Sequence, residues 1–353
     1  CYVFKSFFNF LFKNAFLTIF LIFLSYSAIF AEQLAIKNFS ISEGLARNQV
    51  TIVYTDSYGF TWLGTAGGLS RFDGYGFSNY STRHGLPNSL ISGIAEAENG
   101  VFWVATHGGL CLIDFNQPLD ENGILKIDVV QLGNVRNTTV YSIFQDSRKT
   151  LWAGTRDGLF KVTRTSGGEV RGERIALGED LLPRREGIGN LIEDRKGNLW
   201  ISNPDGLFRL DKNGLIARYK LSGSSYFDRL GNIALDEAGR LWIGGLDGLY
   251  VLKPPVRDEK LENITPPGGA LKLPENDGEF AVFTEKHGLP DDRALEIFRA
   301  SDGQMWIASR KGATLFSGGK FQTFTTRNGL VSDEILCFGE DKAGNVWLGT
   351  EST

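Results

Sequence analysis

All seven tryptophans of the chain occupy the same place in a repeated phrase. They are Trp62, Trp103, Trp152, Trp200, Trp242, Trp306 and Trp347, and consecutive members lie 41 to 64 residues apart. A phrase of short apolar runs that recurs with this period indicates a repeat array rather than a single irregular domain. The tryptophan is therefore expected to be a structural residue of each repeat.

Each phrase predicts a β-hairpin around its tryptophan. A Gly stands three residues before the Trp in six copies, with Lys149 as the exception. An acid stands six residues before it in five copies, Asp56, Asp146, Asp194, Asp236 and Asp341. Asp-x-x-Gly between apolar runs is turn chemistry, because Asp bonds nearby backbone and Gly accepts a positive φ. Aliphatic residues nine and twelve positions before the Trp mark the first strand, and the apolar neighbours of the Trp mark a second strand buried on both faces.

The repeat predicts an all-β fold, a seven-bladed β-propeller, over residues 34–353. In most copies Gly-Leu, six residues past the Trp, opens a third strand, and aromatic pairs such as Phe77 and Tyr80 mark a fourth. Four antiparallel strands repeated radially are typical of propeller blades. We expect Ile36–Phe39 to close the ring against blade seven, which is incomplete because the sequence stops at Thr353. A Pro- and Gly-rich insertion is expected at about 253–279, and a smaller one around Asn116 to Ile127.

The first 31 residues indicate export. Lys5 and Lys13 are their only charges, and an uncharged stretch rich in Phe, Leu and Ile runs from Asn14 to Ala31. This pattern predicts a signal peptide cleaved after Ala31, with an uncleaved membrane anchor as the alternative. The net charge of −4 gives no reason to expect nucleic acid as a partner.

Cysteine and histidine usage predicts structural roles. Cys111 and Cys337 fall in strands of distant blades and are expected to be buried free thiols. His84 and His287 share one repeat position, at the joint between blades. No metal-ligand spacing, nucleophile–base pair or carboxylate pair recurs, so we expect no metal, no cofactor and no catalysis in this segment.

Polar residues in the loops between second and third strands are the candidate ligand contacts. They are His107, Arg156, Asp157, Asp205, Asp247, Arg310 and Lys311. These loops line one rim of a propeller, where converging polar groups could bind a polyhydroxylated ligand. The competing interpretation is that Asp and Gly at these positions only form turns.

The repeats resemble a known family. The phrases Asp236-Glu-Ala-Gly-Arg-Leu-Trp-Ile-Gly244 and Asp341-Lys-Ala-Gly-Asn-Val-Trp-Leu-Gly-Thr350 are similar to the two-component regulator propeller repeat. His-Gly-Leu-Pro at 84–87 and 287–290 resembles the joint between blades of that family. The resemblance covers nearly all of residues 34–350. Blade four departs from it at Ser202-Asn203-Pro204, and blade six at Ala313.

This resemblance implies a sensor at the periplasmic side of a bacterial inner membrane. Such a propeller detects a ligand, an oligosaccharide in some relatives, for a membrane-bound histidine kinase or diguanylate cyclase. It implies membrane attachment through the leader or a later C-terminal span, and a possible homodimer of the full-length protein. Two other classes stay open. A secreted propeller enzyme acting on polysaccharide would need acid and base groups at the channel mouth, where Asp157, Asp205 and Asp247 fall in adjacent blades. A protein-docking propeller would bind no small ligand.

Overall fold

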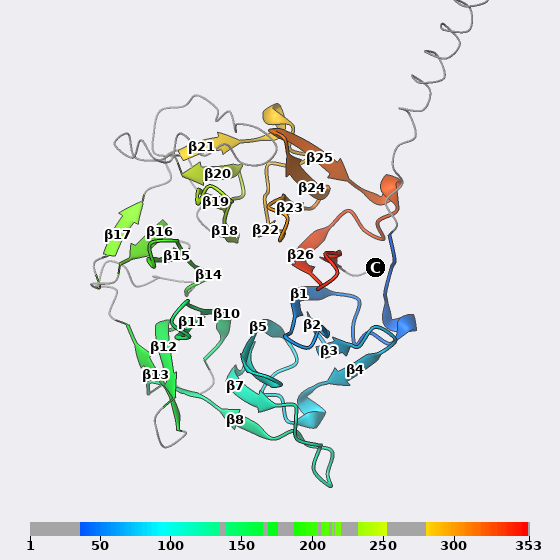
Figure 1. The fold of residues 1–353 in the computed structure, drawn as a ribbon, viewed down its shortest axis with the longest axis vertical. Helices are drawn as coiled ribbons and strands as arrows, with labels where there is room; N and C mark the ends of the chain where they lie inside the picture. The colour runs from blue at the N-terminus through cyan, green and yellow to red at the C-terminus, as the bar shows by residue number, and fades with distance from the viewer. Residues whose placement is uncertain are drawn as a thin grey trace, which may run out of the picture.

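The chain folds into β-sheets arranged around a central axis (Figure 1). The computed structural model describes residues 36–134, 138–164, 169–175, 187–203, 206–211, 214, 216–219, 232–252 and 280–351. Six sheets have four or five strands and one has two, which confirms the all-β propeller. The leader at 1–31 and the insertion at 253–279 lie outside the described residues.

The sheets follow one another along the chain. The first is β1 (Val50–Thr55), β2 (Thr61–Thr65), β3 (Gly68–Phe72) and β4 (Phe77–Tyr80); the second is β5 (Ile91–Glu98), β6 (Val101–Thr106), β7 (Gly109–Asp114) and β8 (Ile127–Val129). The third is β10 (Val140–Gln145), β11 (Leu151–Thr155), β12 (Gly158–Arg164) and β13 (Val170–Arg174), with β9 (Gln131–Leu132) added; the fourth is β14 (Asn190–Glu193), β15 (Leu199–Asn203), β16 (Gly206–Leu210) and β17 (Ile216–Tyr219).

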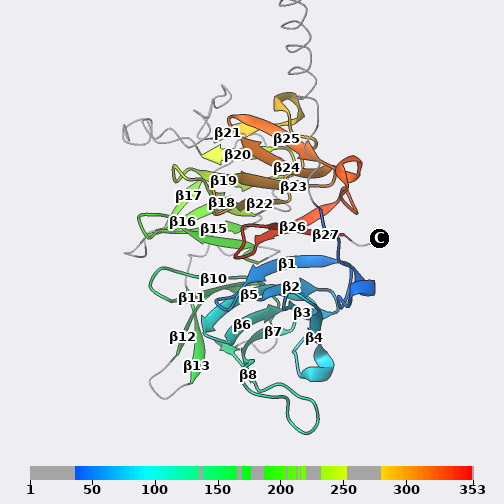
Figure 2. The same cartoon turned by 45° about the vertical axis from the view of Figure 1, so that its right-hand side comes forward.

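The last three sheets are seen from a second side in Figure 2. The fifth is β18 (Ile233–Leu235), β19 (Leu241–Gly244), β20 (Leu249–Leu252) and β21 (Phe280–Phe283); the sixth is β22 (Glu296–Arg299), β23 (Met305–Ser309), β24 (Gly312–Ser317) and β25 (Lys320–Phe324); the seventh is β26 (Ile335–Glu340) and β27 (Val346–Thr350). The first strand of each sheet lies nearest the axis (Figure 1).

Strand β9 is an addition that the repeat does not predict. It follows β8 of blade two directly, but it pairs in parallel with β13 of blade three through Arg171–Gln131 and Gly172–Leu132. Leu132 is buried in the cluster between blades two and three. The smaller insertion was placed correctly, since residues 116–126 form the loop between β7 and β8.

The tryptophans are held by the aspartates of their own hairpins. In five blades the indole Nε1–H donates to the carboxylate six residues earlier at 2.8–3.0 Å. The second carboxylate oxygen accepts the backbone N–H four residues after the Asp at 2.8–2.9 Å. Burial opposes the ionisation of Asp146, Asp194 and Asp341, but these hydrogen bonds lower the pKa of all three. The carboxylate thus ties the turn to the core of the blade.

The joints between blades are short 3₁₀ turns. The turns at Ile41–Glu43, Thr82–His84, Glu285–His287 and Thr326–Asn328 each end at a left-handed Gly with φ between 97° and 102°. His84 and His287 accept the backbone N–H of the residue that precedes each turn, at 3.0 Å through Nδ1. Their structural role is confirmed.

A serine–glutamate pair connects three of the blade junctions. The Ser that follows the Asp position donates both its N–H and its hydroxyl to a Glu of the next blade, seven residues before that blade's Trp. The pairs are Ser57–Glu96, Ser147–Glu193 and Ser301–Glu340, at 2.5–3.0 Å. The serines are exposed and the glutamates only half-buried, so the pairs contribute orientation more than stability.

The ring closes differently from the prediction. Residues 36–40 form no strand; instead Phe39 stacks on Trp347 with ring centroids 5.3 Å apart. Gln49 forms a parallel bridge with Thr350, and Val50, Leu63 and Cys337 share one apolar cluster. A pairing strand after β27, which Ile36–Phe39 would need, is not among the described residues. Side-chain packing and one bridge therefore join the seventh sheet to the first.

Blade six lacks the aspartate and provides a stability test. Ala300 stands at that position with the same turn hydrogen bonds, and the buried Trp306 Nε1 has no partner among the described residues. We predict that Ala300→Asp supplies this acceptor and raises the free energy of unfolding by about 1–2 kcal/mol. Chemical denaturation of both proteins measures the change.

Blade two provides the matched control. Ala97 stands at the same repeat position, but it lies within β5, which continues to Glu98 before the chain turns. Ala97→Asp should therefore give no comparable gain. An unchanged or lower stability of Ala300→Asp would show that the hydrogen bond does not stabilise the blade.

Candidate functional site

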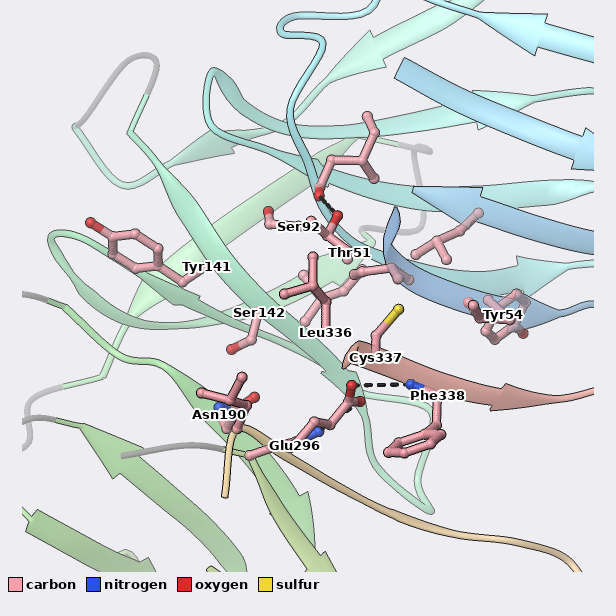
Figure 3. Close-up of a pocket in the computed structure, with 18 of the residues that line it drawn as sticks. Thr51, Tyr54, Ser92, Tyr141, Ser142, Asn190, Glu296, Leu336, Cys337 and Phe338 are labelled. Carbon is pink, nitrogen blue, oxygen red and sulfur yellow. Dashed lines mark hydrogen bonds between the residues drawn. The ribbon is translucent and has the colours of Figure 1, made fainter. Parts of the chain in front are cut away.

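A cavity of about 940 Å³ lies on the propeller axis (Figure 3). Its wall is built mainly from the first strands of the sheets, with His107 and Arg310 from the hairpin loops. A cavity of this size accommodates a small organic molecule.

One repeat position defines the two halves of the wall. The residues ten positions before the tryptophans, Ile52, Gly93, Ser142, Asn190, Asn232, Glu296 and Cys337, all line the cavity. Six of them face a small residue two positions after the tryptophan, as in Ser142–Gly154 and Glu296–Ala308. Blades three to six contribute Ser, Asn, Asn and Glu, whereas blades seven, one and two contribute Cys, Ile and Gly. We call these the polar arc and the apolar arc.

Glu296 is the ionisable member of the polar arc. Its Oε1 accepts from Asn232 Nδ2 at 3.2 Å, and its Oε2 accepts from the backbone N–H of Phe338 at 3.1 Å. The carboxyl therefore bridges blades five, six and seven. Figure 3 shows its hydrogen bond to Phe338 of blade seven. Removal from water raises the pKa of Glu296 to about 8, although the two hydrogen bonds favour the ionised form.

The remaining hydroxyls of the wall fall into two groups. Thr51 Oγ1 donates to the carbonyl of Ile91 at 3.1 Å, and Ser92 Oγ donates to the carbonyl of Val140 at 2.5 Å. Both hydroxyls connect a first strand to the next one. Ser142 is buried, and its hydroxyl has no hydrogen-bond partner in the described part of the chain. Its oxygen points toward the side of the cavity where Asn190 lies (Figure 3).

Cys337 places a thiol beside Glu296 on the neighbouring strand. Burial, and then the Glu296 charge, raise its pKa well above the ordinary value. Cys111, in β7, is also buried, and burial raises its pKa to about 12. Both cysteines are free, as predicted, and at neutral pH both are unreactive thiols.

The predicted rim residues separate into two sets. His107 and Arg310 line the cavity; burial lowers the pKa of His107, and Arg310 pairs with Glu334 at 3.0 Å. Asp157 accepts from the Thr138 hydroxyl, Asp247 accepts from Tyr250 at 2.5 Å, and Lys311 pairs with Glu285 at 2.6 Å. Arg156 is exposed, and Asp205 lies outside the described residues. The structure therefore brings two of the seven to the cavity.

The polar arc was missed because the sequence analysis treated the first strand as structural. The signal was present in the repeat alignment. The positions nine and twelve before Trp are mostly apolar, whereas the position ten before it changes from Ile and Gly to Ser, Asn and Glu. When one position of a regular strand varies in polarity between repeats, its side chain is not required for packing between the blades. Here that position lines the cavity.

The part of the chain that the structure describes contains no group of three or more His, Cys, Asp or Glu side chains placed to hold a metal ion. None of its helices is long and apolar enough to cross a membrane.

The repeats match a described family. The two-component regulator propeller model matches residues 134–157 and 329–352, which contain the hairpins of Trp152 and Trp347. Two of the tryptophan hairpins therefore match this family of repeats. No curated protein matches the chain.

Solved structures share the propeller fold of this chain. The extracellular domain of a putative hybrid two-component system from B. thetaiotaomicron is 20% identical with a TM-score of 0.67, over 89% of this chain and 40% of that one. PorZ, a surface component of the type-IX secretion system of Porphyromonas gingivalis, is 16% identical with a TM-score of 0.62, over 89% and 46%. Virginiamycin B lyase from Staphylococcus aureus is 14% identical with a TM-score of 0.60, over 86% and 92%. At these identities the likeness shows the fold alone.

Glu296 predicts a pH-dependent stability. Its pKa is raised on folding, so the contribution of this group is fully present below about pH 4.5 and is lost as pH rises through about 8. We predict that Glu296→Gln gains stability relative to the native protein by about 1–3 kcal/mol between pH 5 and pH 9, discounted for water in the cavity. Urea denaturation across that range measures the difference. A difference that does not change with pH would contradict the assignment.

Proposed function

We propose that this propeller is the extracytoplasmic ligand-sensing part of a membrane-bound signalling protein of the histidine kinase type. The observation that carries the proposal is the axial cavity, whose polar arc is built into a propeller of two-component regulator repeats. A carbohydrate-like ligand would find hydrogen-bonding groups on one side and an apolar surface for its C–H groups on the other. The output module, the membrane attachment and the periplasmic location belong to this proposal.

The proposal includes a ring of seven blades. Sheet β26–β27 has the first two strands of the repeat, with Trp347 bonded to Asp341 as in the other blades. Two further strands beyond β27 would bring this sheet to the four strands of the others. Phe39 stacks on Trp347 and also packs on Phe72 and Phe77 of the first sheet, so it lies between the seventh sheet and the first.

Binding rather than catalysis is proposed for this segment. An enzyme of the kind considered above needs an acid and a base close together at the cavity. Asp157 and Asp247 are bonded to neighbouring side chains, and neither lines the cavity. Glu296 is the carboxylate that lines it.

Export is tested by a topology fusion. We predict that alkaline phosphatase fused after residue 60 is active in a bacterial host, because the segment from Lys5 to Ala31 directs the chain out of the cytoplasm. A fusion that begins at residue 34 is the matched control and should be inactive. If the fusion that contains the leader is produced in the same amount as the control and is also inactive, export is excluded.

Ligand binding in the cavity is tested by filling it. Leu336 lies in the cavity wall on β26 (Figure 3), and Leu336→Trp adds bulk on the axis. We predict that a sugar from a panel of mono- and disaccharides at about 10 mM raises the Tm of the native protein by about 2–4 °C and leaves the Tm of Leu336→Trp unchanged.

The control adds the same bulk at a distance. Val331 is 52% exposed at a joint between blades, and Val331→Trp should keep the ligand-induced increase in Tm. A Tm increase that persists in Leu336→Trp would place the ligand elsewhere. A panel in which no sugar shifts the native protein would remove the carbohydrate-like ligand from the proposal.

A further inference from the structure

The polar arc contains a carboxyl without a cationic partner. Glu296 has two described hydrogen-bond partners, an amide and a backbone N–H, and both are neutral. The carboxylates of Glu334 and Glu285 do have cationic partners, because Glu334 pairs with Arg310 at 3.0 Å and Glu285 pairs with Lys311 at 2.6 Å. A carboxylate that is partly withdrawn from water and has no cationic partner is unfavourable, so a cationic ligand would gain more here than at the surface.

The surroundings of Glu296 favour an organic cation over a metal ion. Ca²⁺ takes six to eight oxygens and Mg²⁺ six, whereas Glu296 is a single carboxylate beside amides and a hydroxyl. The cavity of about 940 Å³ is also far larger than an ion needs. A primary ammonium has three N–H donors, which suit the carboxylate and neighbouring neutral oxygens.

A second observation points to the same ligand. The Ser142 hydroxyl is buried in the same arc and has no partner among the residues that the structure describes. A buried hydroxyl left unbonded costs free energy, and a ligand hydroxyl can supply the missing bond. Opposite, Ile52, Gly93 and Cys337 offer a surface without charge. The ligand therefore needs a cationic end, hydroxyls along one edge and a face of C–H groups.

We propose that the cavity binds a small hydroxylated ligand with a primary ammonium group, of the amino-sugar type, with the ammonium at Glu296. This inference rests on the proposed sensing function and specifies the ligand of the same site. The carboxylate accepts from the ammonium, Ser142 and the amides of the polar arc bond the hydroxyls, and the apolar arc packs against the ring.

The proposal also predicts proton release. At pH 7 the carboxyl, with a pKa of about 8, is mostly protonated in the free protein. An ammonium holds it ionised, so binding should release about one proton, whereas a neutral sugar releases none. The other titratable groups of the wall are Cys337 on β26, Tyr141 on β10, Tyr54 on β1, and His107, Arg293 and Arg310 toward the loops.

The test compares two ligands that differ in one group. D-glucosamine and D-glucose are titrated calorimetrically into the native protein at pH 7, in two buffers of different ionisation enthalpy. We expect glucosamine to bind at least about tenfold more tightly, with proton release, because the interaction is charge-assisted. In Glu296→Gln the affinities for glucosamine and glucose should differ by no more than about twofold. Glu334→Gln removes a carboxylate that is paired with Arg310, and this variant should still prefer glucosamine.

Each contrary result has its own meaning. Equal affinities for the two sugars, a preference that survives in Glu296→Gln, or glucosamine without saturable binding up to about 50 mM would overturn the ammonium site. The native-protein comparison and the proton count decide the question even where Glu296→Gln folds poorly. If glucose binds and Leu336→Trp blocks it, the sensing function stands without the ammonium site. If Leu336→Trp blocks no ligand, the cavity itself is not the site, and the sensing proposal fails with it.

Discussion

The bond between the turn aspartate and the tryptophan indole is the interaction on which five of the blades depend. A buried indole N–H is stabilised by an acceptor, and the carboxylate that accepts it also holds the backbone of the turn. One side chain thereby fixes the hairpin, the position of the largest core residue and the register between the first two strands. Trp62 and Trp242 are almost fully buried as a result, with exposures of 1% and 0%.

The arrangement leaves one set of positions free of these constraints. The aliphatic positions of the first strand pack between sheets, and the tryptophan strand is buried on both faces. The residue ten positions before the tryptophan lies opposite a small residue and beside the axis, so its chemistry can change without loss of the blade. A repeat protein built this way can alter its ligand and keep its scaffold. The division into a polar and an apolar arc is the form that this variation takes here.

The sequence was sufficient for the hairpins and insufficient for the contacts between them. Asp, Gly and Trp at fixed spacing determine a local turn, and local turns follow from local sequence. The position three residues before the tryptophan illustrates this, because its backbone is left-handed even where the residue is not Gly. Lys149 stands at this position in blade three and has a φ of 64°. The prediction identified this site from its glycines alone.

The errors concern segments whose partners are distant in the sequence. Strand β9 joins a blade other than the one it follows, and no periodicity records that choice. The closing segment at Ile36–Phe39 was expected to pair as a strand, but Phe39 instead stacks on Trp347, more than 300 residues away. The cavity site was missed for a related reason. Glu296 and Asn232 are 64 residues apart, and their contact exists only because the ring places equivalent positions of adjacent blades side by side.

Strand β9 also sets where the array can be divided. A propeller that grows by copying its repeat unit needs boundaries at which one unit ends before the next begins. Between blades two and three that boundary lies after Val130, whose N–H donates to the carbonyl of Leu110 in blade two, because Gln131 and Leu132 follow blade two in the sequence but pair with blade three. A duplication or circular permutation that cuts between Leu132 and Val140 would separate β13 from its outermost partner. A copied unit that keeps blade three whole should therefore begin at β9.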